Sequence, residues 1–199
     1  MKRLGILLSG RGSNFEAIAE NVRLGKLDAE IAAVISNRAE ARGMEIARER
    51  GLPATVLESK GVPREEYDRR LVAELQNRGV ELVCLAGFMR LLTAEFCRAF
   101  PRRALNIHPS LLPAFPGLDA QKQALDHGAK ISGCTVHFVD ERLDGGPIIL
   151  QAAVPLLDDD TEETLAARIL VEEHRIYSEA IAIILSGRWR LEGRRVIAG

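Results

Sequence analysis

Short apolar runs alternate with amphipathic segments along the first half of this chain. Apolar runs of strand length lie at residues 4–8, 31–35, 54–57, 82–86 and 104–108. Between them, apolar residues recur with helical spacing at 15–22, 41–50 and 63–78. Strands that alternate with helices are typical of an open α/β sheet, which binds ligands at the carboxyl ends of its strands.

The second half of the chain predicts fewer elements, one of them long. We expect a short helix at 121–127, strands at 131–139 and 148–151, a long helix from 161 onward, and a charged surface hairpin at 188–196. Asp160 and Glu163 have the spacing of a capping box at the start of the long helix. Glu173 is the single charge on the helix stripe that comprises Ala166, Leu170, Tyr177, Ala180 and Ile184. Such a carboxylate is expected to reach a partner or a pocket, or to extend to solvent at the edge of the stripe.

Two polar residues end the strand predicted at 104–108. Asn106 and His108 are two residues apart, so their side chains project from the same face of the strand. Pro109 cannot continue a sheet ladder, which places both residues at the carboxyl edge. An amide that donates to a developing oxyanion, beside an imidazole that moves protons, suits acyl transfer. A strand-capping Asn beside a half-exposed His is the alternative interpretation.

A proline-rich segment, 109–117, follows these residues and is too irregular for helix or strand. We expect it to act as a lid. Further on, residues 140–147 form an acidic turn with two glycines. Asp144 in this turn is a candidate to hold a histidine in its charged form, although acidic residues in such turns often serve the turn itself.

A glycine turn at residues 9–14 joins the first strand to the first helix. Backbone N–H groups and a helix N-terminus at such a turn collect an anion. Phe15 replaces the third glycine of the dinucleotide fingerprint, and Ser36-Asn37-Arg38 offers no carboxylate for a ribose. The pattern of nucleoside triphosphate loops is absent as well, so a phosphate monoester fits better than NAD or ATP. A turn required only for backbone geometry is the alternative.

A second candidate binding segment follows the fourth strand. Residues 87–92 are apolar except for Arg90, and could line a pocket for a flat, partly anionic ligand or simply pack in the core. Arg64 lies in the first turn of a predicted helix, where a cation opposes the helix dipole. That placement indicates a functional role for Arg64, and a solvated surface arginine is the alternative interpretation.

Composition narrows the class of protein. The chain has 199 residues and a formal net charge of −1, which fits one domain and gives no basic field for nucleic acid or an anionic membrane. No apolar run reaches the length of a membrane span. The three cysteines lack CxxC spacing, which predicts reduced thiols and a cytoplasmic location. His108, His137 and His174 lack metal-ligand spacing, so no metal is expected.

Four motifs, at residues 9–14, 85–90, 106–113 and 144–147, together resemble the phosphoribosylglycinamide formyltransferase family. The resemblance runs over nearly the whole chain. It implies a Rossmann-like formyltransferase fold with a seven-stranded, mostly parallel sheet flanked by helices. It also implies one formyltransferase domain over 1–199, with a phosphate-binding half at about 1–100 and a folate-binding, catalytic half at about 101–199.

The implied reaction transfers the formyl group of 10-formyltetrahydrofolate to the amine of 5-phosphoribosylglycinamide, in purine biosynthesis, without a metal. The implied catalytic residues are Asn106, His108 and Asp144. The implied substrate residues are Gly12, Ser13 and Asn14 at the phosphate, and Glu173 at the amino end. The implied folate residues are Arg64, Met89, Arg90, Leu91, Leu92, Asn106, Asp140, Glu141 and Asp144. The partners expected are these small molecules alone, with the protein a monomer or a homodimer.

Two positions depart from the family pattern. Asp119 stands where many relatives have His, and Leu170 where some have Lys or Gln near the substrate phosphate; Arg11 is a candidate to replace that cation. The alternatives are methionyl-tRNA formyltransferase, a sugar-nucleotide formyltransferase, formyltetrahydrofolate hydrolase, and a non-catalytic nucleotide- or folate-binding module. The first and third normally need an additional domain.

Overall fold

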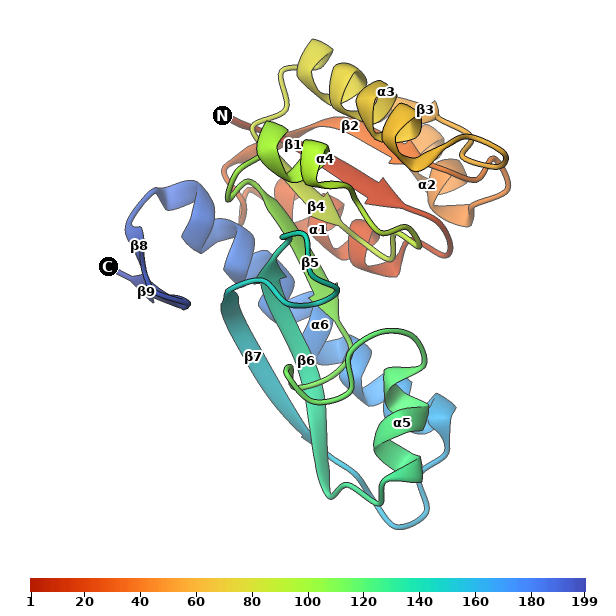
Figure 1. Ribbon diagram of the computed structural model, residues 1–199, viewed down its shortest axis with the longest axis vertical. Helices are drawn as coiled ribbons and strands as arrows, with labels where there is room; N and C mark the ends of the chain where they lie inside the picture. Colours follow the sequence, from red (N-terminus) through yellow and green to blue (C-terminus); the bar gives the residue numbers. More distant parts are fainter. The chain divides into compact units, whose positions relative to one another are not determined.

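A computed structural model describes all 199 residues, with seven strands in one sheet and two in a separate hairpin (Figure 1). The order of the large sheet is β3-β2-β1-β4-β5-β6-β7. The chain divides into two compact units, Met1–Asn106 and Ile107–Gly199, and the boundary falls inside β5 (Ala104–His108). The predicted seven-stranded, mostly parallel α/β sheet is confirmed.

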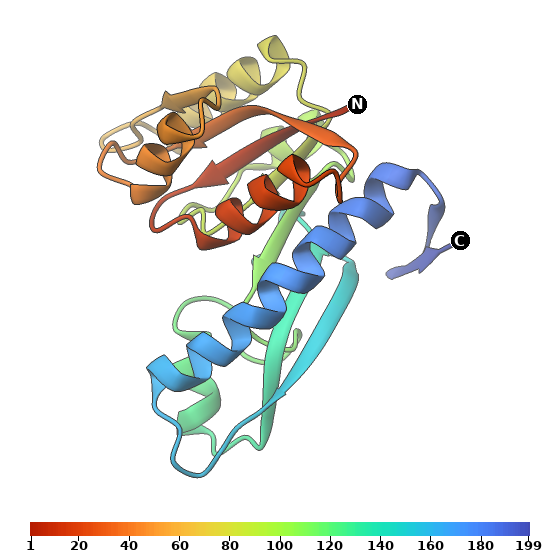
Figure 2. The same ribbon diagram turned by 180° about the vertical axis from the view of Figure 1, so that it is seen from behind.

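The first unit is a parallel α/β arrangement. Its strands are β1 (Lys2–Leu8), β2 (Ala29–Ser36), β3 (Ala54–Val56) and β4 (Leu82–Leu85). Its helices are α1 (Ser13–Arg23), α2 (Arg42–Glu49), α3 (Arg64–Asn77) and α4 (Ala94–Ala99). Helices α1 and α2 cover one face of these strands, and α3 and α4 the other (Figures 1 and 2). Because both faces are covered, the strands are continuous apolar runs, with Leu4, Ile6 and Leu7 fully buried.

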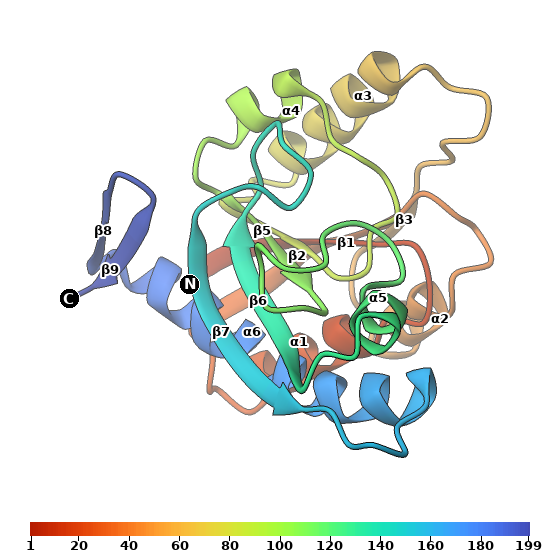
Figure 3. The same ribbon diagram turned by 60° about the horizontal axis from the view of Figure 1, so that its bottom comes forward.

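The second unit is built on an antiparallel pair. Strands β6 (Ile131–Phe138) and β7 (Ile148–Pro155) pair from Ile131↔Pro155 to His137↔Ile148. The unit also contains α5 (Ala120–Asp126) and the long α6 (Glu162–Ser186), which packs along β6 and β7 (Figure 3). Strand β7 runs four residues beyond the predicted end at Gln151, because its outer half pairs with β6.

The start of α6 corrects one prediction. The N-cap is Thr161, not Asp160, and Thr161 forms a capping box with Thr164. Asp160 instead accepts a hydrogen bond from the Leu157 N–H and pairs with Arg168 at 2.8 Å. The buried stripe of the first turns is Leu165 and Ile169, whereas the predicted Ala166 and Leu170 lie half-buried beside it. The rest of the stripe is as predicted, including buried Glu173, Tyr177, Ala180 and Ile184.

Two further elements differ from the sequence predictions or extend them. Helix α4 is a single short element that was not predicted, because six residues are too few to show a helical period. The predicted hairpin exists as β8 (Trp189–Glu192) and β9 (Arg195–Ala198). It contacts the rest of its unit: Trp189 packs on Phe138 with ring centroids 5.2 Å apart, and Arg194 Nη2 donates to the Gly145 carbonyl at 2.7 Å.

Candidate active site

The end of β5 carries the two polar residues as predicted. Asn106 is half-buried, His108 is only 5% exposed, and the strand ends at His108. In the first unit, Asn106 lies opposite Leu85, the last residue of β4. Both residues therefore lie at the carboxyl edge of the parallel strands, where α/β proteins bind ligands.

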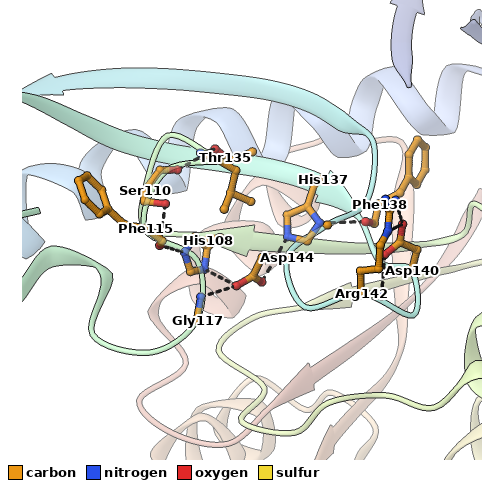
Figure 4. A network of polar contacts seen from close by, with 12 residues as sticks. His108, Ser110, Phe115, Gly117, Thr135, His137, Phe138, Asp140, Arg142 and Asp144 are labelled. Atoms are coloured by element: carbon orange, nitrogen blue, oxygen red, sulfur yellow. Dashed lines mark hydrogen bonds and ion pairs between the residues drawn. The ribbon is translucent and has the colours of Figure 1, made fainter. Parts of the chain in front are cut away.

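One carboxylate lies between two histidines in the second unit (Figure 4). Asp144 Oδ2 is 3.4 Å from Nδ1 of His108, and Asp144 Oδ1 is 3.8 Å from Nε2 of His137. The Gly117 N–H donates to Asp144 Oδ2 at 2.8 Å. All three side chains are nearly buried, so water screens their charges weakly.

The hydrogen bonds of the imidazoles define where protons can lie. Nε2 of His108 is 2.9 Å from the Phe115 carbonyl, which only accepts, so Nε2 carries a proton. A second proton on Nδ1 would point at Asp144, and the charged imidazole would be satisfied on both sides. His137 donates from Nδ1 to the Phe138 carbonyl at 2.8 Å, and burial lowers its pKa, which favours the neutral ring. Asp144 thus faces one nitrogen of each imidazole, and burial disfavours the charged form of His137.

The segment after β5 is irregular, as predicted, but it is firmly anchored. Thr135 Oγ1 on β6 donates to the Ser110 carbonyl at 2.7 Å and accepts from the Leu112 N–H at 3.0 Å. Gln151 Nε2 on β7 donates to the Leu112 carbonyl and to Thr135 Oγ1. Sequence reasoning missed these two anchors. The available signal was the strand alternation, which places Thr135 on the same face of β6 as His137.

The glycine turn after β1 has a clear backbone role. Gly12 has a φ of 82°, and a Cβ there would lie 2.7 Å from Gly43 Cα. Gly12 is also the N-cap of α1 and offers no side-chain cap, so Ser13 and Asn14 begin a helix whose first N–H groups face outward from the helix end. The hydroxyl of Ser9 donates a hydrogen bond to Asn37 Oδ1 at 2.5 Å and accepts one from the Met89 N–H at 2.8 Å. The strained backbone explains the glycine, and the open helix end is compatible with an anion.

Three of the predicted folate residues of the first unit line one open pocket. Arg64, Arg90 and Leu91 surround a volume of about 230 Å³. Met89 and Leu91 are more than half exposed, whereas Leu92 is buried and belongs to the core. Leu92 therefore fits the packing interpretation better than the binding one.

The acidic turn at residues 140–147 makes a tight backbone turn and directs Asp144 toward the two histidines. A Cβ on Gly146 would lie 1.7 Å from the Phe138 carbonyl oxygen, so the turn needs that glycine. Asp140 pairs with Arg142 at 2.5 Å; burial opposes ionisation, but the hydrogen bonds from Arg142 hold the pKa of Asp140 below its usual range. Glu141 is exposed, and Asp144, with a φ of 48°, turns toward the histidines.

The two residues that depart from the family pattern, Asp119 and Leu170, lie at the start of one helix and within another helix of the second unit. Asp119 is the N-cap of α5 with a φ of 55°, and Leu170 lies half-buried on α6 beside the stripe that holds Glu173. No group of three or more histidine, cysteine or acidic side chains is arranged to hold a metal ion. None of the helices combines the length and the apolar character needed to cross a bilayer.

Comparison with known proteins gives one family. The Formyl transferase family pattern matches residues 2–181. Phosphoribosylglycinamide formyltransferase of Escherichia coli (strain K12) is 44% identical over 187 residues, which cover 94% of this chain and 88% of the relative. The trifunctional purine biosynthetic protein adenosine-3 of Drosophila pseudoobscura pseudoobscura is 50% identical over 192 residues, or 95% of this chain, but this chain spans only 14% of that relative.

A solved structure agrees with these relatives. Glycinamide ribonucleotide transformylase 1 from Symbiobacterium toebii has 55% sequence identity and a TM-score of 0.97, covering 100% of this chain and 94% of that chain. The match extends over both units and over all four motifs. This chain belongs to the phosphoribosylglycinamide formyltransferase family.

Proposed function

We propose that this protein transfers a formyl group from 10-formyltetrahydrofolate to the amine of 5-phosphoribosylglycinamide, a step of purine biosynthesis. The observation that carries the proposal is the buried His108–Asp144 pair at the carboxyl end of β5, in a chain of this family. A histidine held against a carboxylate is the acid–base group that formyl transfer needs near neutral pH.

The reaction needs charge stabilisation and one proton movement. The amine nitrogen attacks the formyl carbon, and negative charge develops on the formyl oxygen. Asn106 and protonated His108 donate hydrogen bonds to that oxygen, with Asp144 balancing the imidazolium charge. The new C–N bond forms, the bond from carbon to N10 of the folate breaks, and the proton lost by the amine is returned to N10 through His108.

Only one nitrogen of His108 is available for this work. Nδ1 faces Asp144, so the proton on Nε2 must serve the substrate, and that proton is held by the Phe115 carbonyl at 2.9 Å. The substrate must therefore replace Phe115 as the partner of His108. This exchange gives the segment 109–117 its role as a lid.

The remaining proposed roles follow the two halves of the chain. Residues from about 1 to 100 bind the ribose phosphate through Gly12, Ser13 and Asn14 at the N-terminus of α1. Residues from about 101 to 199 supply the catalytic groups and share the folate site, within one formyltransferase domain. Glu173, buried on α6, meets the substrate amine. Folate is bound by Arg64, Met89, Arg90, Leu91, Asn106, Asp140, Glu141 and Asp144. Leu92 is proposed to shape this site from the core.

The setting of the reaction is proposed as the cytoplasm. The partners are the two small-molecule substrates, the active species is a monomer or a homodimer, and neither a metal, a nucleic acid nor a membrane takes part. The near-neutral charge of the chain supports the proposal that no nucleic acid takes part, since binding of nucleic acid favours a basic surface.

The test is a spectrophotometric assay with 10-formyltetrahydrofolate and 5-phosphoribosylglycinamide, run beside a reaction without acceptor and beside His108→Ala. Release of deformylated folate only with acceptor, and only in the wild type, is expected. Release without acceptor would identify a hydrolase. No release from folded protein would leave a binding module and overturn the proposal.

A further inference from the structure

Two guanidinium groups share the pocket of the first unit without a carboxylate between them. Arg64 Nη2 donates to the Leu91 carbonyl at 3.2 Å, and Arg90 Nη1 donates to the Ser59 carbonyl at 3.4 Å. Neither forms an ion pair, unlike Arg50 and Arg78 in the same unit. Two unpaired cations that line one pocket favour an anionic ligand group there.

An aromatic ring lies under one of these cations. Tyr67 follows Arg64 by three residues on α3, which places both on neighbouring positions of one helix face. The guanidinium carbon of Arg90 is 4.4 Å from the centre of the Tyr67 ring, within the range of a cation–π contact. Tyr67 is fully buried, so the ring is a fixed surface.

The ring, and not the hydroxyl, is what Tyr67 contributes. Its buried hydroxyl has no hydrogen-bond partner, and burial raises the pKa of Tyr67 to about 12, which keeps it neutral. Arg90 Nε is also buried without a hydrogen-bond partner. The direction of the Arg90 guanidinium therefore depends on the Tyr67 ring and on one long hydrogen bond to Ser59.

We propose that Tyr67 is a positioning residue that holds Arg90 in the pocket to receive the glutamate carboxylates of the folate. This inference rests on the proposed function for the identity of the ligand. The carboxylates of its glutamate are the anionic part of a folate. A long arginine side chain without the ring would have to give up its rotamer freedom on binding, which weakens affinity.

The test measures equilibrium binding of the 10-formyl dideaza analogue of folate and of the same analogue without its glutamate. Tyr67→Leu removes the ring, and Tyr67→Phe removes only the hydroxyl. We expect Tyr67→Leu to raise the Kd of the glutamate-bearing analogue about tenfold, as loss of a desolvated cation–π contact allows. The Kd of the glutamate-free analogue, and both Kd values of Tyr67→Phe, should stay within about twofold of the wild type.

A matched control exists in the same unit. Phe100 is 2% exposed and lies under Arg103, whose guanidinium carbon is 5.6 Å from the ring centre, but neither residue lines the pocket. Phe100→Leu removes a similar buried ring beneath an arginine. It should lower the unfolding temperature as Tyr67→Leu does, and leave both Kd values unchanged.

If Tyr67→Leu is unfolded at the assay temperature, Arg90→Lys takes its place, because it keeps the charge and loses the planar group that lies on the ring. The same selective loss of the glutamate-bearing analogue is expected. Equal loss of both analogues, or no loss of either, would overturn the inference. So would a wild type that binds both analogues equally. A wild type that makes the distinction but transfers no formyl group would instead refute the proposed function alone.

Discussion

Asp144 lies 3.4 Å from Nδ1 of His108, and the opposite nitrogen of that ring lies 2.9 Å from the Phe115 carbonyl. Each nitrogen of the imidazole thus faces an oxygen that can accept a hydrogen bond, which fixes the orientation of the ring. A single carboxylate can in this way orient the histidine ring that it faces.

The first prediction concerns turnover. Asn106→Ala, His108→Ala and Asp144→Ala should each lower kcat at least about a hundredfold, as expected for the loss of an oxyanion donor or of the charge that supports it. Asp158→Ala is the control, because Asp158 is an exposed carboxylate paired only with Lys130. Steady-state kinetics of purified variants measures the effect, and near wild-type turnover would remove a residue from the catalytic set.

The second prediction concerns pH and stability. Burial lowers the pKa of His137 in the folded state below the ordinary value of 6.5. As the pH falls, His137 therefore takes up a proton in the unfolded chain before it does so in the folded chain. The free energy of unfolding of the protein accordingly falls progressively below about pH 6.5. Above that pH, His137 is neutral in both states and does not lower the free energy of unfolding.

Urea unfolding at about pH 7.5 and about pH 5 measures this dependence. His137→Gln should lose less stability between the two pH values than the wild type. His127→Gln, which changes an exposed histidine, should behave like the wild type. An unchanged pH slope in His137→Gln would show that this ring is not the group responsible.

The third prediction concerns the anchor of the lid segment. Thr135→Val leaves the buried Ser110 carbonyl and Leu112 N–H without their hydroxyl partner, and should destabilise the fold by about 1–3 kcal/mol. Thr135→Ser keeps the hydroxyl and should recover most of this loss. Chemical denaturation of the two variants decides the matter: equal stability would mean that the hydroxyl contributes nothing.

The fourth prediction concerns the glycine turn. Gly12→Ala places a Cβ 2.7 Å from Gly43 Cα at a φ of 82°, and should lower the free energy of unfolding by more than about 1 kcal/mol. Gly10→Ala meets nothing within 4 Å and should leave stability nearly unchanged. Thermal unfolding of the pair provides the comparison, and two equal unfolding temperatures would contradict the prediction.

The sequence by itself determined the parallel half of the fold. Buried parallel strands are short apolar runs, and helices α1, α2 and α3 between them carry regular apolar stripes, so these elements could be predicted from local patterns. The short α4 could not. The end of β5 was readable too, because Pro109 stops the strand directly after His108. Strand alternation alone placed Asn106 and His108 on one face.

Only the tertiary structure decided which groups hold one another. Asp144 reaches His108 from 36 positions away in the sequence, and Thr135 and Gln151 bind a segment from other strands. The N-cap of α6 was also decided by the tertiary structure. Thr161 has the extended backbone of an N-cap, whereas Asp160 forms an ion pair with Arg168. Periodicity records which face of an element is buried, but hydrogen bonds between distant elements leave no period in the sequence.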